Sequence, residues 1–437
     1  MMTSRSDDEG MIGVDEALHA ILEGITPLPT EERPILDALG LILAEDIVAA
    51  ENNPPFRNSA MDGYAVRAAD LAGATQARPI QLRVVAEGPA GYVPRGEVTP
   101  GTAIRIMTGA PMPPGADTVV RFEETDEHQH GIAPKTASMV QIVVAQGQWI
   151  NVREAGEDIR AGATVFQRGV LLRPAEIGVL ASLGRATVQV HRRPVVAIIS
   201  TGDEVVDLGQ PLQPGQIRNS NSYTLAALVQ RYGGLPRLLG VARDTIADLT
   251  ALLATARDAD LIISSGGVSV GDYDMVKDVL RAEGQIDIWQ VRMKPGKPLA
   301  YGRLGGKPFL GLPGNPVAAY VSFELFARPI LLRQLGHTRL GKPAVRARVT
   351  APVTNSGGRR HFVRAFVANG PQGPETRPTG EQGSGVLTAL TRANGLLVVT
   401  DNRETVAVGE EVEVLLLHRE QGSDLPTDEQ EDSTSPL

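Results

Sequence analysis

Cysteine does not occur in this chain of 437 residues. Its absence excludes disulfide bonds, zinc sites built from thiolates and a cysteine nucleophile. The seven histidines show no metal-ligand spacing, so a zinc site made of histidines is not expected either. No apolar run approaches the length of a membrane span, and the first ten residues lack the apolar core of a signal peptide. We therefore expect a cytoplasmic protein with no membrane partner.

An excess of basic charge is also missing. The formal net charge is -9, and residues 1–10 and 419–437 together hold nine acidic and two basic residues, a net of -7. The rest of the chain, with 42 acidic and 40 basic residues, therefore carries a net charge of only -2. Nucleic acid is not the expected partner, although a local basic loop can still bind a small anion.

The first half of the chain predicts a helical unit followed by a β domain. Apolar residues near the start have helical spacing, and the apolar segment 36–49 continues them up to a break at Pro54 and Pro55. Short apolar runs separated by glycine and proline clusters then fill residues 79–144, which is typical of a small β domain.

From Pro194 onward, strands and helices alternate. The runs at 195–200, 237–241 and 260–264 have the composition of buried strands, and the segments between them have helical spacing. This alternation predicts a doubly wound parallel sheet, in which ligands bind beyond the carboxyl ends of the strands. Two polar segments follow strands there, STGDE at 200–204 and SSGGVSVGD at 264–272.

The fold class is therefore α/β and β multidomain. It combines the doubly wound domain with a helical linker domain, a small β domain and a C-terminal β barrel-like domain, which alternating apolar stretches after Leu335 predict. The predicted boundaries are a disordered tail at 1–10, the small β domain at 53–148, the doubly wound domain at 191–337, the C-terminal domain at 338–418 and a disordered acidic tail at 419–437, with the helical linker unit beginning at residue 11.

The glycine-rich segment 264–271 suits a phosphate, because its backbone N–H groups can converge on an anion. A tight turn that needs glycine for backbone reasons alone is an equally good interpretation. Asp272 and Asp274 follow directly and can hold magnesium beside a phosphate or cap a helix. Glu204 adds an acidic group at the same edge of the predicted sheet.

Two lysines, Lys294 and Lys297, are carried on a rigid turn, KPGKP, into which a dianion would fit. Surface lysines are usually only solvated, and it is the stiff frame and the nearby turn GLPGNP at 311–316 that favour a functional role. The segments around Asp62 and Thr108 contain only ordinary turn signals when each is considered alone.

Taken together, these segments resemble the molybdopterin molybdotransferase family, which includes bacterial MoeA and the C-terminal domain of gephyrin. The resemblance spans roughly residues 11–418 through a colinear set of motifs: NSAMDGYA, IMTGAPMPPGAD, REAGEDI, STGDE, NSN, SGGVSVGDYD, KPGKP, GLPGNP, GGRRHFVR, QGSG and LTRANGL. Each motif is weak by itself, and the ordered set is very specific.

The resemblance implies an elongated homodimer in which residues 11–52 and 149–190 form an elongated linker and dimerisation domain and the doubly wound domain binds the pterin nucleotide. Its motif positions assign catalytic roles to Asp62, Thr108, Asp158, Glu204, Asp274, Lys294 and Lys297. They assign cofactor binding to Thr201, Gly202, Asp203, Ser265, Gly266, Gly267, Val268, Ser269, Gly271, Pro313, Gly314 and Asn315. They assign molybdate binding to Lys294, Lys297, Arg359 and Ser384, with Arg360 as the alternative to Arg359. Asp274 would be the metal ligand, and His361 stands where relatives often have an acidic residue.

The implied reaction inserts molybdenum from molybdate into adenylylated molybdopterin and releases AMP, with Mg²⁺ as cofactor. Molybdopterin adenylyltransferase and molybdoenzymes would be further partners of the homodimer. Two alternatives remain: a non-catalytic scaffold of the same fold, and a molybdopterin adenylyltransferase. The second would use only residues 194–335 and would leave the other domains unexplained.

Overall fold

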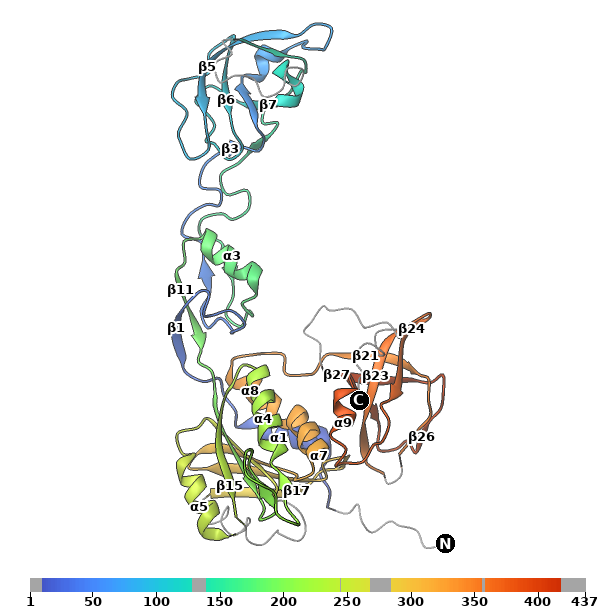
Figure 1. The fold of residues 1–437 in the computed structure, drawn as a ribbon. Helices are drawn as coiled ribbons and strands as arrows, with labels where there is room; N and C mark the ends of the chain where they lie inside the picture. The colour runs from blue at the N-terminus through green and yellow to red at the C-terminus, as the bar shows by residue number, and fades with distance from the viewer. Residues whose placement is uncertain (1–9, 128–138, 244, 268–283, 356–357, 418–437) are drawn as a thin grey trace. The chain divides into compact units, whose positions relative to one another are not determined.

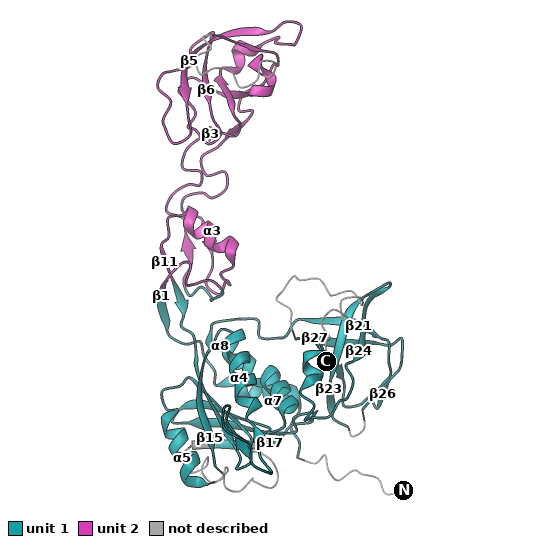
Figure 2. Ribbon diagram, in the orientation of Figure 1, with its two compact units in different colours: residues 1–32, 40–44, 189–437 teal, residues 33–39, 45–188 magenta. Residues whose placement is uncertain are grey.

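The computed structural model describes residues 10–127, 139–243, 245–267, 284–355 and 358–417. These form two compact units (Figure 2). Unit 1 comprises Met1–Glu32, Gly40–Ala44 and Gln189–Leu437, and unit 2 comprises Arg33–Leu39 and Glu45–Val188. The predicted disordered tails lie outside the described residues, apart from Gly10. No helix of the described ranges is long and apolar enough to cross a membrane.

Unit 2 contains the predicted small β domain. Its five-stranded sheet has the order β7-β4-β6-β5-β8, and the strands are β4 (Gly63–Val66), β5 (Ile80–Gly88), β6 (Thr102–Ile106), β7 (Thr118–Arg121) and β8 (Met139–Ile142). Pro79 lies just outside β5, as expected for a residue that cannot donate to a sheet. Tyr64, Leu82 and Val120 are buried between these strands and form the centre of the core.

The remaining elements of unit 2 are short. They are β2 (Ile47–Val48), β3 (Asn58–Ser59), β9 (Val152–Arg153), β10 (Thr164–Phe166), the 3-10 helices Ala68–Leu71 and Phe122–Glu124, and α3 (Pro174–Ser182). Strands β3 and β9 pair with each other, as do β2 and β10. A further two-stranded sheet consists of β1 (Thr30–Pro34) and β11 (Thr187–His191).

The helical interpretation of segment 36–49 is wrong. Residues 35–40 form turns, and only β2 and isolated bridges follow. Gly40 has a φ of 78°, which a right-handed helix cannot contain. The first helix, α1 (Val14–Glu23), does form where helical spacing predicted it, and its buried residues Val14, Ala17 and Ile21 belong to the core of unit 1.

The doubly wound domain in unit 1 is confirmed. Its six-stranded sheet has the order β15-β12-β16-β20-β19-β17, with strands β12 (Val195–Thr201), β15 (Leu235–Ala242), β16 (Leu261–Ser265), β17 (Gly284–Gln290), β19 (Pro298–Leu304) and β20 (Lys307–Leu312). The first four strands in that order are parallel, and β19 and β17 extend the sheet as antiparallel strands. A parallel pair of short strands, β13 (Val205–Val206) and β14 (Ile217–Arg218), lies outside this sheet.

Helices cover both faces of this sheet (Figure 1). Val196 and Ile198 pack with α1, α4 (Ser220–Arg231), α7 (Pro316–Ser322), the π-helix Phe323–Ala327 and α8 (Arg328–Gln334). Ala197 and Ile199, which point to the other face, pack with Leu249 and Leu253 of α5 (Ile246–Thr255). Burial on both faces explains why β12 is apolar at successive positions and does not alternate.

The C-terminal domain is a barrel. Strands β23, β24, β21, β27 and β25 close on themselves, because β25 pairs with both β27 and β23. The elements are β18 (Met293–Lys294), β21 (Ala344–Val349), β22 (Val353–Thr354), β23 (Arg360–Gly370), β24 (Gly373–Pro378), α9 (Thr388–Thr391), β25 (Gly395–Val399), β26 (Thr405–Val406) and β27 (Glu411–Leu416). Strand β18, which lies in sequence between β17 and β19 of the doubly wound sheet, joins the barrel by pairing with β23.

Candidate functional site

Three strand ends of the doubly wound sheet meet at one edge. Ser200 of β12 is in register with Ser265 of β16, and Ser265 is in register with Leu312 of β20. The predicted segments Thr201–Glu204, Ser265–Gly267 and Pro313–Asn315 begin where these strands end. The structure therefore brings together three of the segments that the sequence assigned to nucleotide binding.

Glycine is required where these loops approach one another. Gly266 has a φ of 92°, and a Cβ there would lie 2.8 Å from both the carbonyl oxygen and Oγ1 of Thr201. A Cβ on Gly314 would lie 3.6 Å from Cα of Gly266. The N–H of Gly266 also donates to the carbonyl of Leu312 at 3.0 Å. The loop after β16 can come this close to Thr201 only because Gly266 has no side chain, whereas a Cβ on Gly314 would make an ordinary contact.

The Thr201 hydroxyl is available to a ligand. Its residue is 6% exposed, and Oγ1 has no hydrogen-bond partner among the described residues. A buried hydroxyl without a partner costs free energy, so a bound oxygen acceptor would be stabilised here. Gly202 and Glu204 follow, and a Cβ on Gly202 would lie 2.6 Å from the Glu204 carboxylate, which therefore lies over the glycine. Asp203 is exposed at the same edge.

The second half of the site is cationic, and the pairing of β18 with β23 creates it. Lys294 of β18 lies opposite His361 of β23. Gly296, in the turn that follows, has a φ of 98° and a Cβ position only 2.6 Å from the Ser322 hydroxyl oxygen of α7. The turn that carries Lys294 and Lys297 is thus pressed against a helix of the doubly wound domain.

His361 is buried among cations. It is 3% exposed, and neither ring nitrogen has a hydrogen-bond partner among the described residues. Burial, together with the charges of Lys294, Arg364 and Arg359, lowers the pKa of His361 to about 4. The imidazole is therefore neutral near pH 7. The pocket contains a neutral group where the resemblance suggested an acidic one, so no carboxylate at this position offsets the lysine.

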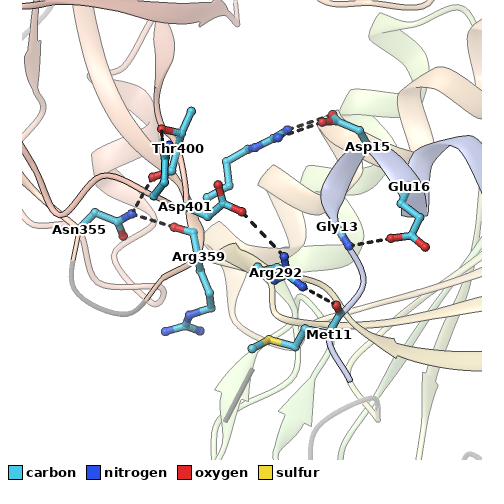
Figure 3. Close-up of polar contacts among 11 residues, drawn as sticks. Met11, Gly13, Asp15, Glu16, Arg292, Asn355, Arg359, Thr400 and Asp401 are labelled. Carbon is cyan, nitrogen blue, oxygen red and sulfur yellow. Dashed lines mark hydrogen bonds and ion pairs between the residues drawn. The ribbon is translucent and has the colours of Figure 1, made fainter. Parts of the chain in front are cut away.

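The contacts of the two adjacent arginines differ. Arg360 donates two hydrogen bonds of 2.9 Å to the carboxylate of Asp15. This pairing raises the pKa of Arg360. The Arg359 guanidinium makes no ion pair within the described residues, and Figure 3 shows it pointing away from Asp15 and Asp401. Its backbone carbonyl accepts a hydrogen bond from the Asn355 side chain at 2.8 Å. Of the two arginines, Arg359 is the one whose charge is left for an anion.

The start of the chain supports this part of the site. Arg292 donates to the carbonyl of Met11 at 3.0 Å and lies 4.0 Å from the carboxylate of Asp401 (Figure 3). The backbone N–H of Arg360 donates to the carbonyl of Arg292. Residues 11–15 thus contact both Arg292, just before strand β18, and Arg360, the first residue of strand β23.

Ser384 reaches the site through its backbone. Its carbonyl accepts a hydrogen bond of 3.0 Å from the N–H of Val317 in the first turn of α7. The loop that carries it is held by Arg364, which is fully buried and donates to the carbonyls of Glu381 and Gly383 at 3.0 Å each. Burial lowers the pKa of Arg364. The sequence analysis did not single out this residue, although an arginine inside the apolar run HFVRAFV was the available signal.

The early motifs lie in unit 2. Asp62 accepts hydrogen bonds from the backbone N–H and the hydroxyl of Thr108, at 2.7 and 2.8 Å, and both lower its pKa. Asp158 instead accepts a hydrogen bond of 3.3 Å from the Asn53 side chain. The structure therefore joins Asp62 with Thr108, while Asp158 contacts a different segment.

The predicted metal site cannot be located. Val268, Ser269, Gly271, Asp272 and Asp274 lie outside the described residues. Within the ranges that are described, no group of three or more histidine, aspartate or glutamate side chains could hold a metal ion.

Three family matches follow one another along the chain. Residues 12–184 match "MoeA N-terminal region (domain I and II)", residues 197–333 match "Probable molybdopterin binding domain", and residues 346–417 match "MoeA C-terminal region (domain IV)". The three matches cover the segments that contain both halves of the site and the early motifs.

Similar proteins cover nearly the whole chain. "Molybdopterin molybdenumtransferase 2" of Mycobacterium tuberculosis is 42% identical over 388 residues, which is 87% of this chain and 93% of that protein. "Molybdopterin molybdenumtransferase" of Haemophilus influenzae is 37% identical over 408 residues, 92% of this chain and 98% of that protein. The crystal structure of the molybdopterin biosynthesis MoeA protein of Pyrococcus horikoshii matches with a TM-score of 0.79 at 30% identity, over 93% of this chain and 100% of that one.

Proposed function

The chain belongs to the MoeA family, and from the charge of its pocket we propose that it transfers molybdenum from molybdate to adenylylated molybdopterin and releases AMP. It is a molybdopterin molybdotransferase, as its relatives' names state of them.

One observation carries the proposal for the oxyanion. Lys294 and Arg359 both act with their charge on the buried His361, whose ring nitrogens have no hydrogen-bond partner among the described residues, and Lys297 belongs to the same turn as Lys294. Cations gathered without a carboxylate repel one another, and a bound dianion removes that repulsion. We therefore propose that Lys294, Lys297 and Arg359 bind molybdate, and that Ser384 lines the same pocket.

The glycine-lined edge suits the other substrate. The Thr201 hydroxyl lacks a partner among the described residues, and Gly266, which has no side chain, brings the backbone of its loop close to Thr201. We propose that Thr201–Glu204, Ser265–Gly271 and Pro313–Asn315 bind the phosphates of the pterin nucleotide. Val268, Ser269 and Gly271 enter this proposal through the motif alone.

Cleavage of the anhydride between AMP and the pterin phosphate requires one oxygen atom. We propose that a molybdate oxygen, held by Lys294 and Lys297 next to the nucleotide loops, forms the new bond to phosphorus as the anhydride P–O bond breaks, so that AMP and the pterin phosphate both leave as phosphomonoesters. The Mo–O bond of that oxygen breaks as the two dithiolene sulfurs bind molybdenum, and the two thiol protons leave with a second molybdate oxygen as water. As the P–O bond breaks, negative charge grows on the departing phosphate, and fixed cations stabilise such charge more effectively than water does. The chain has no cysteine that could compete with the dithiolene sulfurs for molybdenum.

Magnesium remains a predicted cofactor with Asp274 as its ligand. When bound, the ion would offset negative charge on the phosphates. Of the predicted acidic groups at this edge, Asp203 and Glu204 are described and both are exposed.

The test is AMP release from adenylylated molybdopterin with and without molybdate. Lys294→Ala and Lys297→Ala should each weaken molybdate binding by about 1.5–3 kcal/mol, because each removes a charge-assisted contact. The matched control is Lys307→Ala, since Lys307 begins strand β20 at the end remote from the site. Molybdate-dependent AMP release supports the transferase, ATP-dependent adenylylation would indicate an adenylyltransferase, and neither activity would indicate a scaffold. Unchanged molybdate affinity in both variants would remove the two lysines from the pocket.

We further propose a cytoplasmic homodimer in which each catalytic site uses residues of both subunits. The support is that Asp62 and Thr108 belong to unit 2, whereas Lys294 and Arg359 belong to unit 1. A two-fold dimer repeats each contact, so a dimer of one Asp62→Ala and one Lys294→Ala subunit would have one site with both substitutions and one with neither. Purified mixed dimers should regain about half of the wild-type activity. Activity no higher than that of the two inactive parents would show that each subunit builds its site alone.

A further inference from the structure

The first turn of α4 is hydrogen-bonded to the ends of all three strands at the nucleotide edge. Asn219, the N-cap of α4, accepts hydrogen bonds from the N–H of Ser222 at 3.2 Å and from the hydroxyl of Ser200 at 2.9 Å. The hydroxyls of Ser200 and Ser222 are 2.8 Å apart and form a hydrogen bond. These contacts fix the start of α4 to β12, because Ser200 is the last residue but one of that strand.

Asn221, two residues after Asn219, connects α4 to the ends of the other two strands. Its Nδ2 donates to the hydroxyl oxygen of Ser265 at 2.8 Å and to the carbonyl of Gly314 at 2.7 Å. The amide group has two N–H bonds, so these two contacts use its donors completely. Because the Gly314 carbonyl can only accept, the orientation of the amide is also determined. One side chain thus ties the loop after β16 to the loop after β20.

The support behind Asn221 is rigid. Leu225, Leu228 and Val229, further along α4, are buried in the core on one face of the sheet. The helix therefore cannot shift easily, and the two hydrogen bonds of Asn221 transmit its position to both loops. Fixed loops are what an anion site needs, since backbone N–H groups bind a phosphate well only when they are held in place before it arrives.

We propose that Asn221 is a positioning residue for the pterin nucleotide, which sets the spacing between the Ser265–Gly267 and Pro313–Asn315 loops. The proposal rests on the proposed function of this edge. Asn221 itself need not touch the substrate, because its donors are occupied by Ser265 and Gly314. Without it, the loops keep their backbone donors but lose the fixed distance between them.

Two variants and one control test the proposal on the full-length protein. Asn221→Ala removes both hydrogen bonds, and Asn221→Asp keeps the size of the side chain but places a carboxylate oxygen against the Gly314 carbonyl. The control is Gln230→Ala, an exposed residue near the other end of α4. Steady-state AMP release gives KM separately for adenylylated molybdopterin and for molybdate, and thermal unfolding reports stability.

We expect Asn221→Ala to raise KM for adenylylated molybdopterin about tenfold, which corresponds to about 1.4 kcal/mol at 25 °C. KM for molybdate and Tm should stay at the wild-type values. Asn221→Asp should raise the nucleotide KM more than Asn221→Ala, because repulsion replaces donation. Gln230→Ala should behave as wild type.

Three results would overturn the proposal while leaving the proposed function intact: an unchanged nucleotide KM in Asn221→Ala, a smaller defect in Asn221→Asp than in Asn221→Ala, or a parallel rise of both KM values with a lowered Tm. The last would mean that Asn221 serves only stability. If the wild-type protein itself releases no AMP in response to molybdate, it is the proposed function that fails.

Discussion

The buried His361 should make the stability of unit 1 depend on pH. The residue is 3% exposed, and burial together with the charges of Lys294 and Arg364 lowers its pKa from an ordinary value of 6.5 to about 4. An unfolded chain exposes the ring and restores the ordinary pKa. The native state therefore binds fewer protons than the unfolded state between these two pKa values, and stability rises with pH across that window.

The magnitude follows from the two pKa values. The contribution of neutral His361 to the free energy of unfolding is fully present above pH 6.5 and is lost as the pH falls toward 4. Between about pH 7 and about pH 5 the loss amounts to about 2 kcal/mol, since one pKa unit corresponds to about 1.4 kcal/mol.

The assay is urea unfolding followed by tryptophan fluorescence. The chain has two tryptophans, and a Trp149→Phe background leaves Trp289 of β17, in the unit that contains His361, as the reporter. His361→Gln, which is neutral at every pH, should remove most of the loss. His19→Gln, an exposed histidine of α1, is the matched control. The same pH dependence in His361→Gln as in the starting protein would refute the reasoning.

Three further predictions concern other contacts. Gly296→Ala should lower molybdate affinity in calorimetry and destabilise the turn by about 1–3 kcal/mol, because Gly296 has a φ of 98°. Lys342→Met should lower the free energy of unfolding, measured in urea, by about 3 kcal/mol, because the fully buried Glu324 carboxylate loses a partner at 2.6 Å. Adding Glu324→Gln to this variant should recover part of the lost stability. Thr108→Val should raise the pKa of Asp62, observed by NMR, because one of its two hydrogen bonds disappears while the backbone N–H still lowers that pKa.

The doubly wound sheet was predictable because burial on both faces leaves a strong signal in the sequence. Val196 to Ile199 are consecutive apolar residues whose side chains enter two different cores, and few soluble structures other than a central parallel strand require that. The cap of α5 was predictable for a similar reason. Thr245 accepts a hydrogen bond from the N–H of Asp248 at 3.2 Å, as a threonine before an apolar helical run should.

The prediction of a helix over segment 36–49 was wrong because apolar content alone does not specify a helix. Leu41, Ile42 and Leu43 are buried next to one another, whereas Leu36 is 75% exposed. Exposure at Leu36 followed by burial at three consecutive positions, 41–43, matches neither the helical nor the strand period. Its structure depends on long-range contacts such as the bridge from Leu43 to Val190, which the local sequence does not reveal.

The candidate site also depends on long-range contacts that the local sequence does not reveal. The motifs correctly placed the loops at the ends of strands. The side chains that hold these loops, however, come from segments that are far away in the sequence. Asn221 lies 93 residues from Gly314, and Arg360 lies 345 residues from Asp15. The choice of Arg359 over Arg360 as an anion ligand depends entirely on where Asp15 lies. A motif can therefore name a set of candidate ligands, but the partners that occupy some of them decide which remain to bind the substrate.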